Sequence, residues 1–214
     1  MTECIICGNN TFKLKFHYLK KPDQETDFRI KKKYYERFYI ECKKCLHLTS
    51  LMSFDLNNLY KKNYSKLTYG KKIFKVFNKI KNLPKTKSDN FFRLKRFVKF
   101  FRKKNKINGK FLDIGAGTGI FPYALKKLNL KIDCIETDEN FRKHLKSNLN
   151  LNLITDNYHS KKLKSKYDVI SINKVLEHVS NLDDFLNKIL VVLKKNGYLY
   201  FEVPDAQKAA NISK

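Results

Sequence analysis

The second half of the chain alternates short apolar runs with stretches in which apolar residues recur every three or four positions. The runs predict five strands, at residues 111–114, 132–135, 151–154, 169–172 and 198–203. The stretches between them predict helices at residues 121–127, 139–148 and 182–195. Because strands joined by helical crossovers lie parallel, the pattern predicts an α/β fold with a doubly wound, mostly parallel sheet of about five strands.

The segment before that half, residues 53–108, is basic and has a helical period that is broken at Pro84. We predict a helix over residues 90–104 with Asp89 as its N-cap, because apolar side chains recur there at spacings of three and four. Those side chains are Phe91, Leu94, Val98 and Phe101. Such a helix usually covers one face of a neighbouring sheet, and the alternative is that it lies on nucleic acid or on an anionic membrane.

Composition narrows the class of protein. The 214 residues are 42% hydrophobic and 14% aromatic, which is too apolar for a disordered chain. The apolar runs are shorter than a membrane span, and the first residues lack the basic and apolar regions of a secretory signal, so we expect a cytoplasmic protein. Shifts in composition predict a small module at residues 1–52, a helical connector at 53–108 and the sheet core at 109–214.

The chain carries 46 Lys and Arg side chains against 20 acidic ones, a formal net charge of +26. Only six of the positive side chains are arginine, whereas a surface that reads nucleic acid usually contains more of these planar groups. Most of the excess lies in residues 1–110. We interpret it first as a solvated lysine-rich surface, and an acidic partner of the N-terminal half is the alternative.

Four of the five cysteines form two C-x-x-C pairs, Cys4 with Cys7 and Cys42 with Cys45. Each pair can place two thiolates on one ion, so the two pairs predict a tetrahedral Zn²⁺ site. A site with four cysteine ligands has no open position and is structural. It suits a zinc ribbon in residues 1–52, a segment too small to depend on its own core. A redox pair and incidental cysteines are the alternatives.

Three alternating glycines, Gly115, Gly117 and Gly119, separate a predicted strand from a predicted helix. Glycines let the chain turn sharply and let a ligand approach the main chain closely. A dinucleotide fingerprint has the spacing G-x-G-x-x-G, and the acidic Asp113 just before the loop would repel a diphosphate. The pattern instead suits a ligand that carries a cationic amino group at this place.

This glycine stretch, with its preceding aspartate, resembles the first motif of class I S-adenosylmethionine-dependent methyltransferases, and later positions agree in order over residues 109–205. The resemblance implies that Glu136, at the end of the second strand, accepts hydrogen bonds from both ribose hydroxyls of the cofactor. It implies that Asp156 receives the adenine amino group. The implied cofactor-binding residues are Asp113, Gly115, Ala116, Gly117, Gly119, Glu136, Asp156, Asn157 and Asn173.

The order of zinc module, helical connector and core resembles methyltransferases that act on nucleotide-linked sugars and related small molecules, in which Tyr60 and Tyr64 would be connector tyrosines. The chain also resembles ribosomal-RNA methyltransferases with a zinc finger, which its basic N-terminal half would suit. Residues 173–176, Asn-Lys-Val-Leu, differ from the Asn/Asp-Pro-Pro-aromatic pattern of base-nitrogen methyltransferases, and Cys134 fits the core better than an active site. We therefore expect a small-molecule acceptor, with RNA as the alternative and a cofactor-binding module without turnover as the second.

Glu177 and His178 are the acid and the imidazole nearest the methyl-transfer mouth that the resemblance implies. A neutral His178 can take a proton from a hydroxyl or a carbon acid, so these two residues are the catalytic candidates. The alternative is that both residues hydrogen-bond a loop and start the next helix.

The usual sheet of this family has seven strands, and the sequence leaves no room for the last two after Asp205. We interpret the chain as a fragment or a shortened gene product, or as one whose open edge is covered by a partner. Because Phe201 and Val203 would be left uncovered on the last strand, we expect weak cofactor binding, self-association through that edge and little turnover.

Overall fold

The structure is a computed structural model in which the chain divides into two compact units, each described here by itself: Met1–Lys61 with Asp205–Lys214, and Lys62–Pro204. The structure describes residues 3–22, 30–52, 68, 70, 72–158, 163, 164 and 166–205. The predicted connector tyrosines, Tyr60 and Tyr64, lie outside these residues. No helix in the described ranges combines the length and the apolar character that crossing a membrane requires.

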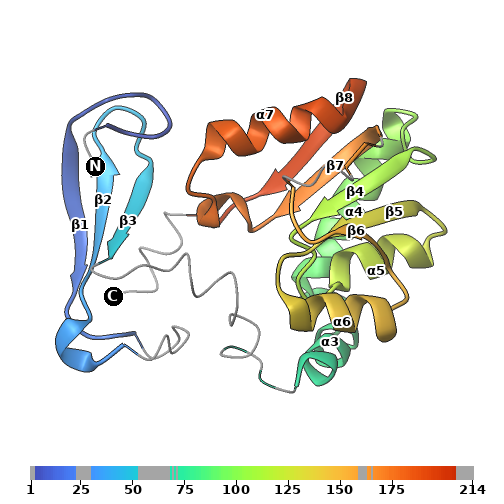
Figure 1. Cartoon of the computed structure of the whole chain (residues 1–214), viewed down its shortest axis with the longest axis horizontal. Coiled ribbons are helices and arrows are strands. Elements are labelled where there is room, and N and C mark those ends of the chain that lie inside the picture. The colour runs from blue at the N-terminus through green and yellow to red at the C-terminus, as the bar shows by residue number, and fades with distance from the viewer. Residues whose placement is uncertain are drawn as a thin grey trace. The chain divides into compact units, whose positions relative to one another are not determined.

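The first unit contains a three-stranded antiparallel sheet in the order β1-β2-β3 (Figure 1). Its elements in chain order are β1 (Phe12–Tyr18), the 3-10 helix η1 (Lys32–Tyr34), β2 (Arg37–Cys42) and β3 (Leu48–Met52). Cross-strand ring contacts join the strands, and the ring of His17 stacks on that of Phe38 with centroids 4.3 Å apart. Among the described residues of this unit, the buried side chains are Cys4, Tyr35 and Cys42.

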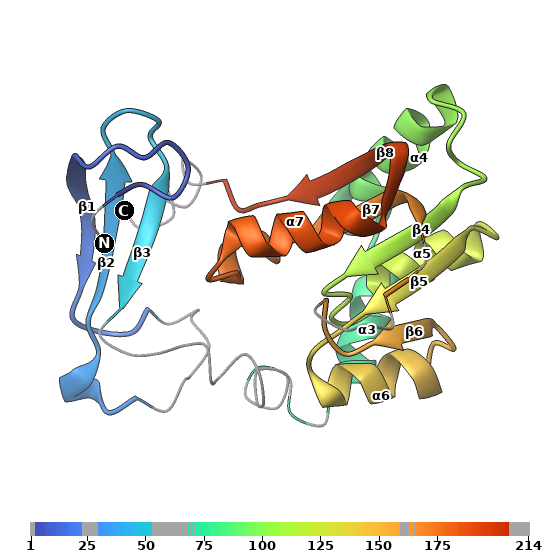
Figure 2. The same ribbon diagram turned by 45° about the horizontal axis from the view of Figure 1, so that its top comes forward.

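The second unit is built on a five-stranded parallel sheet in the order β6-β5-β4-β7-β8 (Figure 2). Its strands are β4 (Lys110–Ile114), β5 (Lys131–Ile135), β6 (Asn152–Thr155), β7 (Tyr167–Asn173) and β8 (Leu193–Glu202). The predicted α/β fold with about five parallel strands is confirmed. The chain runs outward from β4 to β6 and then returns to the other side of β4, so the strand order reverses between β4 and β7. Ligands of such sheets bind at this switch point, beyond the carboxyl ends of the strands.

Four helices pack on one face of the sheet. They are α3 (Ile73–Lys81), α4 (Asp89–Lys103), α5 (Ile120–Lys127) and α6 (Glu139–Ser147), with the 3-10 helix η2 (Lys85–Lys87) between the first two. Phe97 of α4 is fully buried and contacts Phe111 of β4 at 5.7 Å between ring centroids, which confirms that this phenylalanine-rich helix covers the sheet. The predicted N-cap Asp89 is wrong by one residue, because the side chain of Ser88 accepts the hydrogen bond from the Phe91 amide at 3.2 Å.

Helix α7 (Leu182–Val192) covers the opposite face, where Phe185 and Ile189 are buried (Figures 1 and 2). The prediction of a helix over residues 182–195 is wrong at its end. Leu193 has extended backbone angles and pairs with Tyr167, so α7 ends three residues before the predicted helix end and β8 begins five residues before the predicted strand.

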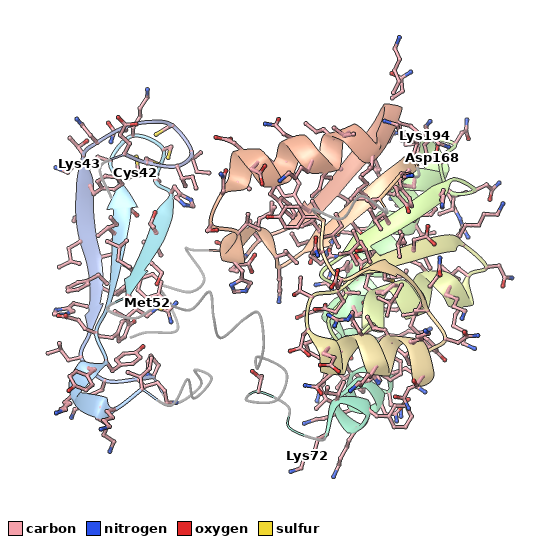
Figure 3. The ribbon with its side chains drawn as sticks, in the orientation of Figure 1. Cys42, Lys43, Met52, Lys72, Asp168 and Lys194 are labelled. Atoms are coloured by element: carbon pink, nitrogen blue, oxygen red, sulfur yellow. The ribbon has the colours of Figure 1, made fainter. Side chains whose placement is uncertain are left out.

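Asp168 fixes the sheet at the end opposite the glycine loop. Its Oδ2 accepts hydrogen bonds from the Lys110 amide and from Lys194 Nζ, each at 2.8 Å, and Figure 3 labels Asp168 and Lys194 near one another. Burial acts to raise the pKa of Asp168, but these hydrogen bonds bring that pKa below its ordinary value. A charged network therefore holds the amino ends of β4 and β7, and the carboxyl ends carry the candidate site.

Candidate functional site

The carboxyl ends of four neighbouring strands bring the predicted cofactor residues together. In the parallel register, Ile114 of β4 lies opposite Ile135 of β5 and Ile172 of β7, and Ile135 lies opposite Thr155 of β6. The residues that follow these positions therefore share one edge of the sheet: Gly115, Glu136, Asn173 and Asp156.

The three loop glycines have positive φ angles, which are 71° at Gly115, 53° at Gly117 and 76° at Gly119. A Cβ atom on Gly115 would lie 2.4 Å from Val175, and one on Gly119 would lie 2.4 Å from Leu145. A Cβ on Gly117 would meet nothing closer than 3.9 Å. Packing thus requires two of the glycines, while the third leaves open space in which a ligand can approach the main chain.

The carboxyl group of Asp113 is buried at the end of β4. Its Oδ1 accepts hydrogen bonds from Ser171 Oγ at 2.6 Å and from Asn173 Nδ2 at 3.4 Å. Burial raises the pKa of Asp113 to about 7, the charge of Glu136 adds to the rise, and the Ser171 hydrogen bond opposes it. A cationic amino group bound here would favour the carboxylate and donate charge-assisted hydrogen bonds to it.

Glu136 is 6% exposed and ties the glycine loop to the end of β5. Its Oε2 accepts a hydrogen bond from the Gly117 amide at 2.7 Å, and its Oε1 accepts one from the Asp138 amide at 2.9 Å. Burial raises the pKa of Glu136, although these two amides oppose the rise. Each carboxylate oxygen has a second lone pair, so Glu136 can also accept hydrogen bonds from a diol.

Asp156 and Asn157 lie at the rim of this edge. Asp156 is exposed at the end of β6, and its Oδ1 accepts a hydrogen bond from Asn157 Nδ2 at 2.9 Å. A groove of about 720 Å³ opens beside Asp156 along α6 and β6. Ala116 lies within the glycine loop, where its amide donates to the Ile135 carbonyl at 3.3 Å. The rim thus offers acceptors that an adenine amino group can reach from solvent.

The side-chain oxygen of Asn173 is buried and has no hydrogen-bond partner among the described residues. Leaving a buried acceptor unpaired costs about 1–3 kcal/mol, so a donor from a ligand would stabilise this position. Asp113, Glu136 and Asn173 together present acceptors beside the open backbone of Gly117. This set fits the ammonium and ribose hydroxyl groups of S-adenosylmethionine.

Glu177 and His178 lie in the 3-10 helix η3 (Leu176–His178), directly after the Val175 that packs over Gly115. Both side chains are more than a third exposed, yet nearby protein atoms desolvate them. This desolvation raises the pKa of Glu177 and lowers the pKa of His178. His178 is therefore neutral near pH 7 and able to accept a proton, and its role in catalysis stays a prediction.

Two side chains that the sequence analysis did not single out also support the site. Arg93 of α4 pairs with Glu202 at 2.7 Å, and its charge opposes the rise in the pKa of Asp113. His144 of α6 is buried with Nε2 3.2 Å from the Thr118 carbonyl in the glycine loop. Because only six of the 46 basic residues are arginine, each arginine could have been considered as a candidate for a specific contact, and Arg93 could have been found in this way. No local pattern marks His144, because its contact depends on how α6 packs.

The four paired cysteines meet in the first unit. Their Sγ atoms all lie within 4.8 Å of one another, and the Cys4–Cys45 and Cys7–Cys42 distances are both 3.6 Å. Sulfur atoms bound tetrahedrally to zinc at about 2.3 Å lie about 3.8 Å apart, whereas a disulfide requires about 2.05 Å. The spacing fits a shared metal ion and not a disulfide, and Figure 3 shows yellow sulfur atoms near the labelled Cys42.

The thiols of this cluster differ in how readily they ionise. The Cys45 amide and, to a smaller extent, the thiols of Cys7 and Cys45 lower the pKa of Cys42 to about 6, although burial opposes this shift. The His47 amide also acts to lower the pKa of Cys45, but burial and the neighbouring thiols raise it to about 12. A divalent cation would favour every thiolate at once, including that of Cys45. His47 itself contributes backbone, since its carbonyl accepts from the Cys42 amide at 2.9 Å.

The fold and the site define a class of protein. A parallel sheet with a glycine loop at its switch point, and acidic residues at the ends of the adjoining strands, is the architecture of a Rossmann-like S-adenosylmethionine-dependent methyltransferase. Residues 87–213, more than half of the chain, match the model of the methyltransferase domain family. The chain belongs to this family.

Two curated relatives match part of the chain. It is 34% identical over 106 residues to the ribosomal protein L11 methyltransferase of Campylobacter concisus, a match that covers 48% of this chain and 37% of that protein. It is 31% identical over 119 residues to the mitochondrial ubiquinone biosynthesis O-methyltransferase of Schizosaccharomyces pombe, covering 51% and 43%. The chain thus spans less than half the length of either relative.

Two solved structures have the same fold. The plantazolicin methyltransferase BpumL, in complex with a monoazolic desmethylPZN analog and SAH, has a TM-score of 0.51 at 24% identity, covering 68% of this chain and 56% of that one. DesVI of Streptomyces venezuelae has a TM-score of 0.51 at 14% identity, covering 63% and 57%. At these identities the likeness concerns the fold.

Proposed function

We propose that this chain transfers a methyl group from S-adenosylmethionine to a small molecule, with nucleotide-linked sugars and similar metabolites as the preferred class. The observation that carries the proposal is the edge where buried acceptors converge beside an open backbone. Asp113 and Asn173 would hold the ammonium group of the cofactor and Glu136 its ribose hydroxyls. The charge of Arg93 is near enough to lower the pKa of Asp113, which supports the carboxylate form that the ammonium group requires.

The bound cofactor supplies a methyl group on a positively charged sulfur, which leaves with the electrons of the broken carbon–sulfur bond. The contribution of the chain is to align the acceptor and to exclude competing water. In the proposal His178 takes the acceptor's proton, because its lowered pKa keeps the imidazole neutral, and Glu177 lies next to it in η3.

A small-molecule acceptor is favoured over RNA because Cys134, the cysteine considered as a nucleophile toward a base, is not accessible. Cys134 is fully buried within β5, and burial raises its pKa well above the ordinary value, so it is a poor nucleophile toward a base. RNA stays the alternative because of the +26 charge, and a cofactor-binding module without turnover is the second. The relative named for ribosomal protein L11 adds a protein acceptor to the outcomes of the test.

We also propose that Cys4, Cys7, Cys42 and Cys45 bind one structural Zn²⁺. The sulfur distances match the edge of a zinc-centred tetrahedron, and the cluster supplies most of the buried side chains described in its unit. With four thiolates on the ion no coordination position is open, so the metal would stabilise the unit and take no part in methyl transfer.

The assay that tests the function uses the full chain with S-adenosylmethionine labelled in the methyl group. Nucleotide-linked sugars, ribosomal RNA and ribosomal protein are offered separately, and Glu136→Ala is the control for label that does not depend on the site. Transfer of label to the sugars by the wild-type protein, but not by Glu136→Ala, supports the proposal. Label in RNA or protein alone contradicts the acceptor class. Cofactor binding without any transfer would support the module alternative.

A further inference from the structure

A cavity of about 260 Å³ lies between α4 and the carboxyl ends of β7 and β8, beside the candidate cofactor site. Its lining comes from three elements that are distant in sequence: Asp89, Phe92, Arg93, Arg96, Lys174 and Glu202. Three of these side chains are cationic and two are carboxylates, so the lining has one positive charge in excess.

The two arginines are held in place by a single carboxylate. Arg93 and Arg96 are three residues apart on α4 and therefore project to the same side of the helix. Glu202 accepts from Arg93 at 2.7 Å and from Arg96 at 3.2 Å, and Tyr200 Oη donates to it at 2.7 Å. These contacts orient the guanidinium groups and leave Arg96 with a side chain that is 64% exposed.

Lys174 brings the third cation to the cavity from the methyl-transfer side. It follows Asn173 directly and has a φ angle of 55°, and its amide donates to the Glu202 carbonyl at 2.8 Å. Within the described residues its ammonium group forms no ion pair. Arg93 is only 11% exposed and is near enough to influence Asp113, so Arg96 and Lys174 are the cations that face outward.

We infer that Arg96 and Lys174 bind a phosphate group of the methyl acceptor, and that the exposed ring of Phe92 contacts its apolar part. This inference rests on the proposed function and narrows its substrate class to phosphate-bearing molecules. The guanidinium fork gives two parallel hydrogen bonds to a phosphate, and the lysine adds a mobile point charge. A dianionic group changes the net charge of the lining from one positive to one negative, whereas a neutral acceptor leaves the one positive charge in excess.

Inorganic pyrophosphate is the probe, titrated calorimetrically into the full chain saturated with S-adenosylmethionine. We expect Arg96→Gln and Lys174→Gln each to weaken pyrophosphate binding by about tenfold, on the scale of one charge-assisted hydrogen bond. Arg102→Gln is the matched control, because Arg102 is an exposed arginine on the same helix and does not line the cavity. Cofactor affinity should be the same in all three variants.

An equal loss of pyrophosphate binding in the Arg102→Gln control would overturn the inference. Unchanged pyrophosphate binding in a variant that combines Arg96→Gln with Lys174→Gln would also overturn it. Displacement of the cofactor by pyrophosphate would also overturn it, since the anion would then occupy the cofactor's own carboxylate site. Malonate, a dicarboxylate, is titrated in parallel to distinguish a site for phosphate from a site for carboxylate. Tighter binding of malonate than of pyrophosphate would reject a phosphate site. Titration of S-adenosylmethionine alone into wild-type protein tests the proposed function separately.

Discussion

In the unit Lys62–Pro204, helices on both faces of the sheet bury large apolar side chains, and Phe97 and Ile189 are fully enclosed. In the described part of the other unit, two of the three buried side chains are the thiols Cys4 and Cys42. Each buried aliphatic or aromatic side chain contributes about 1.5–3 kcal/mol to folding, so the two units differ greatly in the apolar stabilisation available to them.

The comparison teaches that aromatic content alone does not make a core. The first unit is rich in aromatic residues, but its three strands form a single layer, and rings such as His17 and Phe38 stack on each other at the surface of that layer. With no helix packed across a face within its described residues, the unit needs another source of stability. The proposed metal, held by four thiolates, would provide one that does not depend on size.

The largest expected effect is loss of structure in the first unit on removal of its metal. Elemental analysis of purified protein should give about one zinc per chain. Cys42→Ser should abolish hydrogen-exchange protection in β1 to β3 and leave the parallel sheet protected. Cys134→Ser is the counterpart, because it should keep the zinc and weaken only the sheet unit. Retained protection in metal-free protein would contradict the comparison.

The next largest effect concerns the core of the second unit. Phe97→Ala removes a fully buried ring and should lower the free energy of unfolding by about 3–5 kcal/mol, measured by urea denaturation. Phe100→Ala on the same helix is the matched control, since Phe100 is 45% exposed and should cost much less. Equal losses of unfolding free energy in the two variants would contradict the assignment of Phe97 to the buried face of α4 and of Phe100 to its exposed face.

Glu136→Ala should weaken binding of S-adenosylmethionine by about 1.5–3 kcal/mol, the scale of hydrogen bonds to a charged acceptor. The substitution also removes the acceptor of the Gly117 amide, so the loop loses its anchor. Isothermal titration measures the loss, and circular dichroism checks that the sheet is intact. Asp183→Ala is the control, because Asp183 is an exposed carboxylate on α7 and does not line the groove beside Asp156, so this variant should bind as wild type.

The pH dependence of cofactor binding should follow Asp113. The pKa of Asp113 is raised to about 7, so the free protein is protonated there below that pH, and the cationic ligand requires the carboxylate. Binding then releases a proton, and the dissociation constant should rise by about tenfold for each pH unit below 7. Asp113→Asn should bind weakly and lose this dependence on pH. A wild-type affinity that is constant from pH 5 to 8 would exclude the role.

The smallest expected effect is self-association through β8, one of the two edge strands of the parallel sheet in the described residues. Phe201 of β8 is 57% exposed, and Val203, which follows this strand, is 51% exposed. Light scattering of the purified chain should show concentration-dependent dimers, and Phe201→Lys should reduce them because a charge opposes edge pairing. A monodisperse monomer with ordinary turnover would contradict this expectation.

The sequence alone was sufficient for features that depend on spacing along the chain. The apolar runs predicted four strands of the parallel sheet to within about two residues and the second half of β8, and the C-x-x-C pairs predicted the cysteine cluster. The glycine loop was identified from its spacing, and the acidic residues beside it were implied by the resemblance to the methyltransferase family. The parallel register then aligns Gly115, Glu136 and Asn173 at one edge of the sheet.

Tertiary structure decided what depends on contacts between distant residues. Leu193 lies in β8, where the local period favoured helix, because it pairs with Tyr167 of β7. The placement of Arg93 and Arg96 against Glu202 joins positions more than 100 residues apart. Local propensity could not indicate these outcomes, because each depends on a packing partner or an opposing charge that only the folded chain brings near.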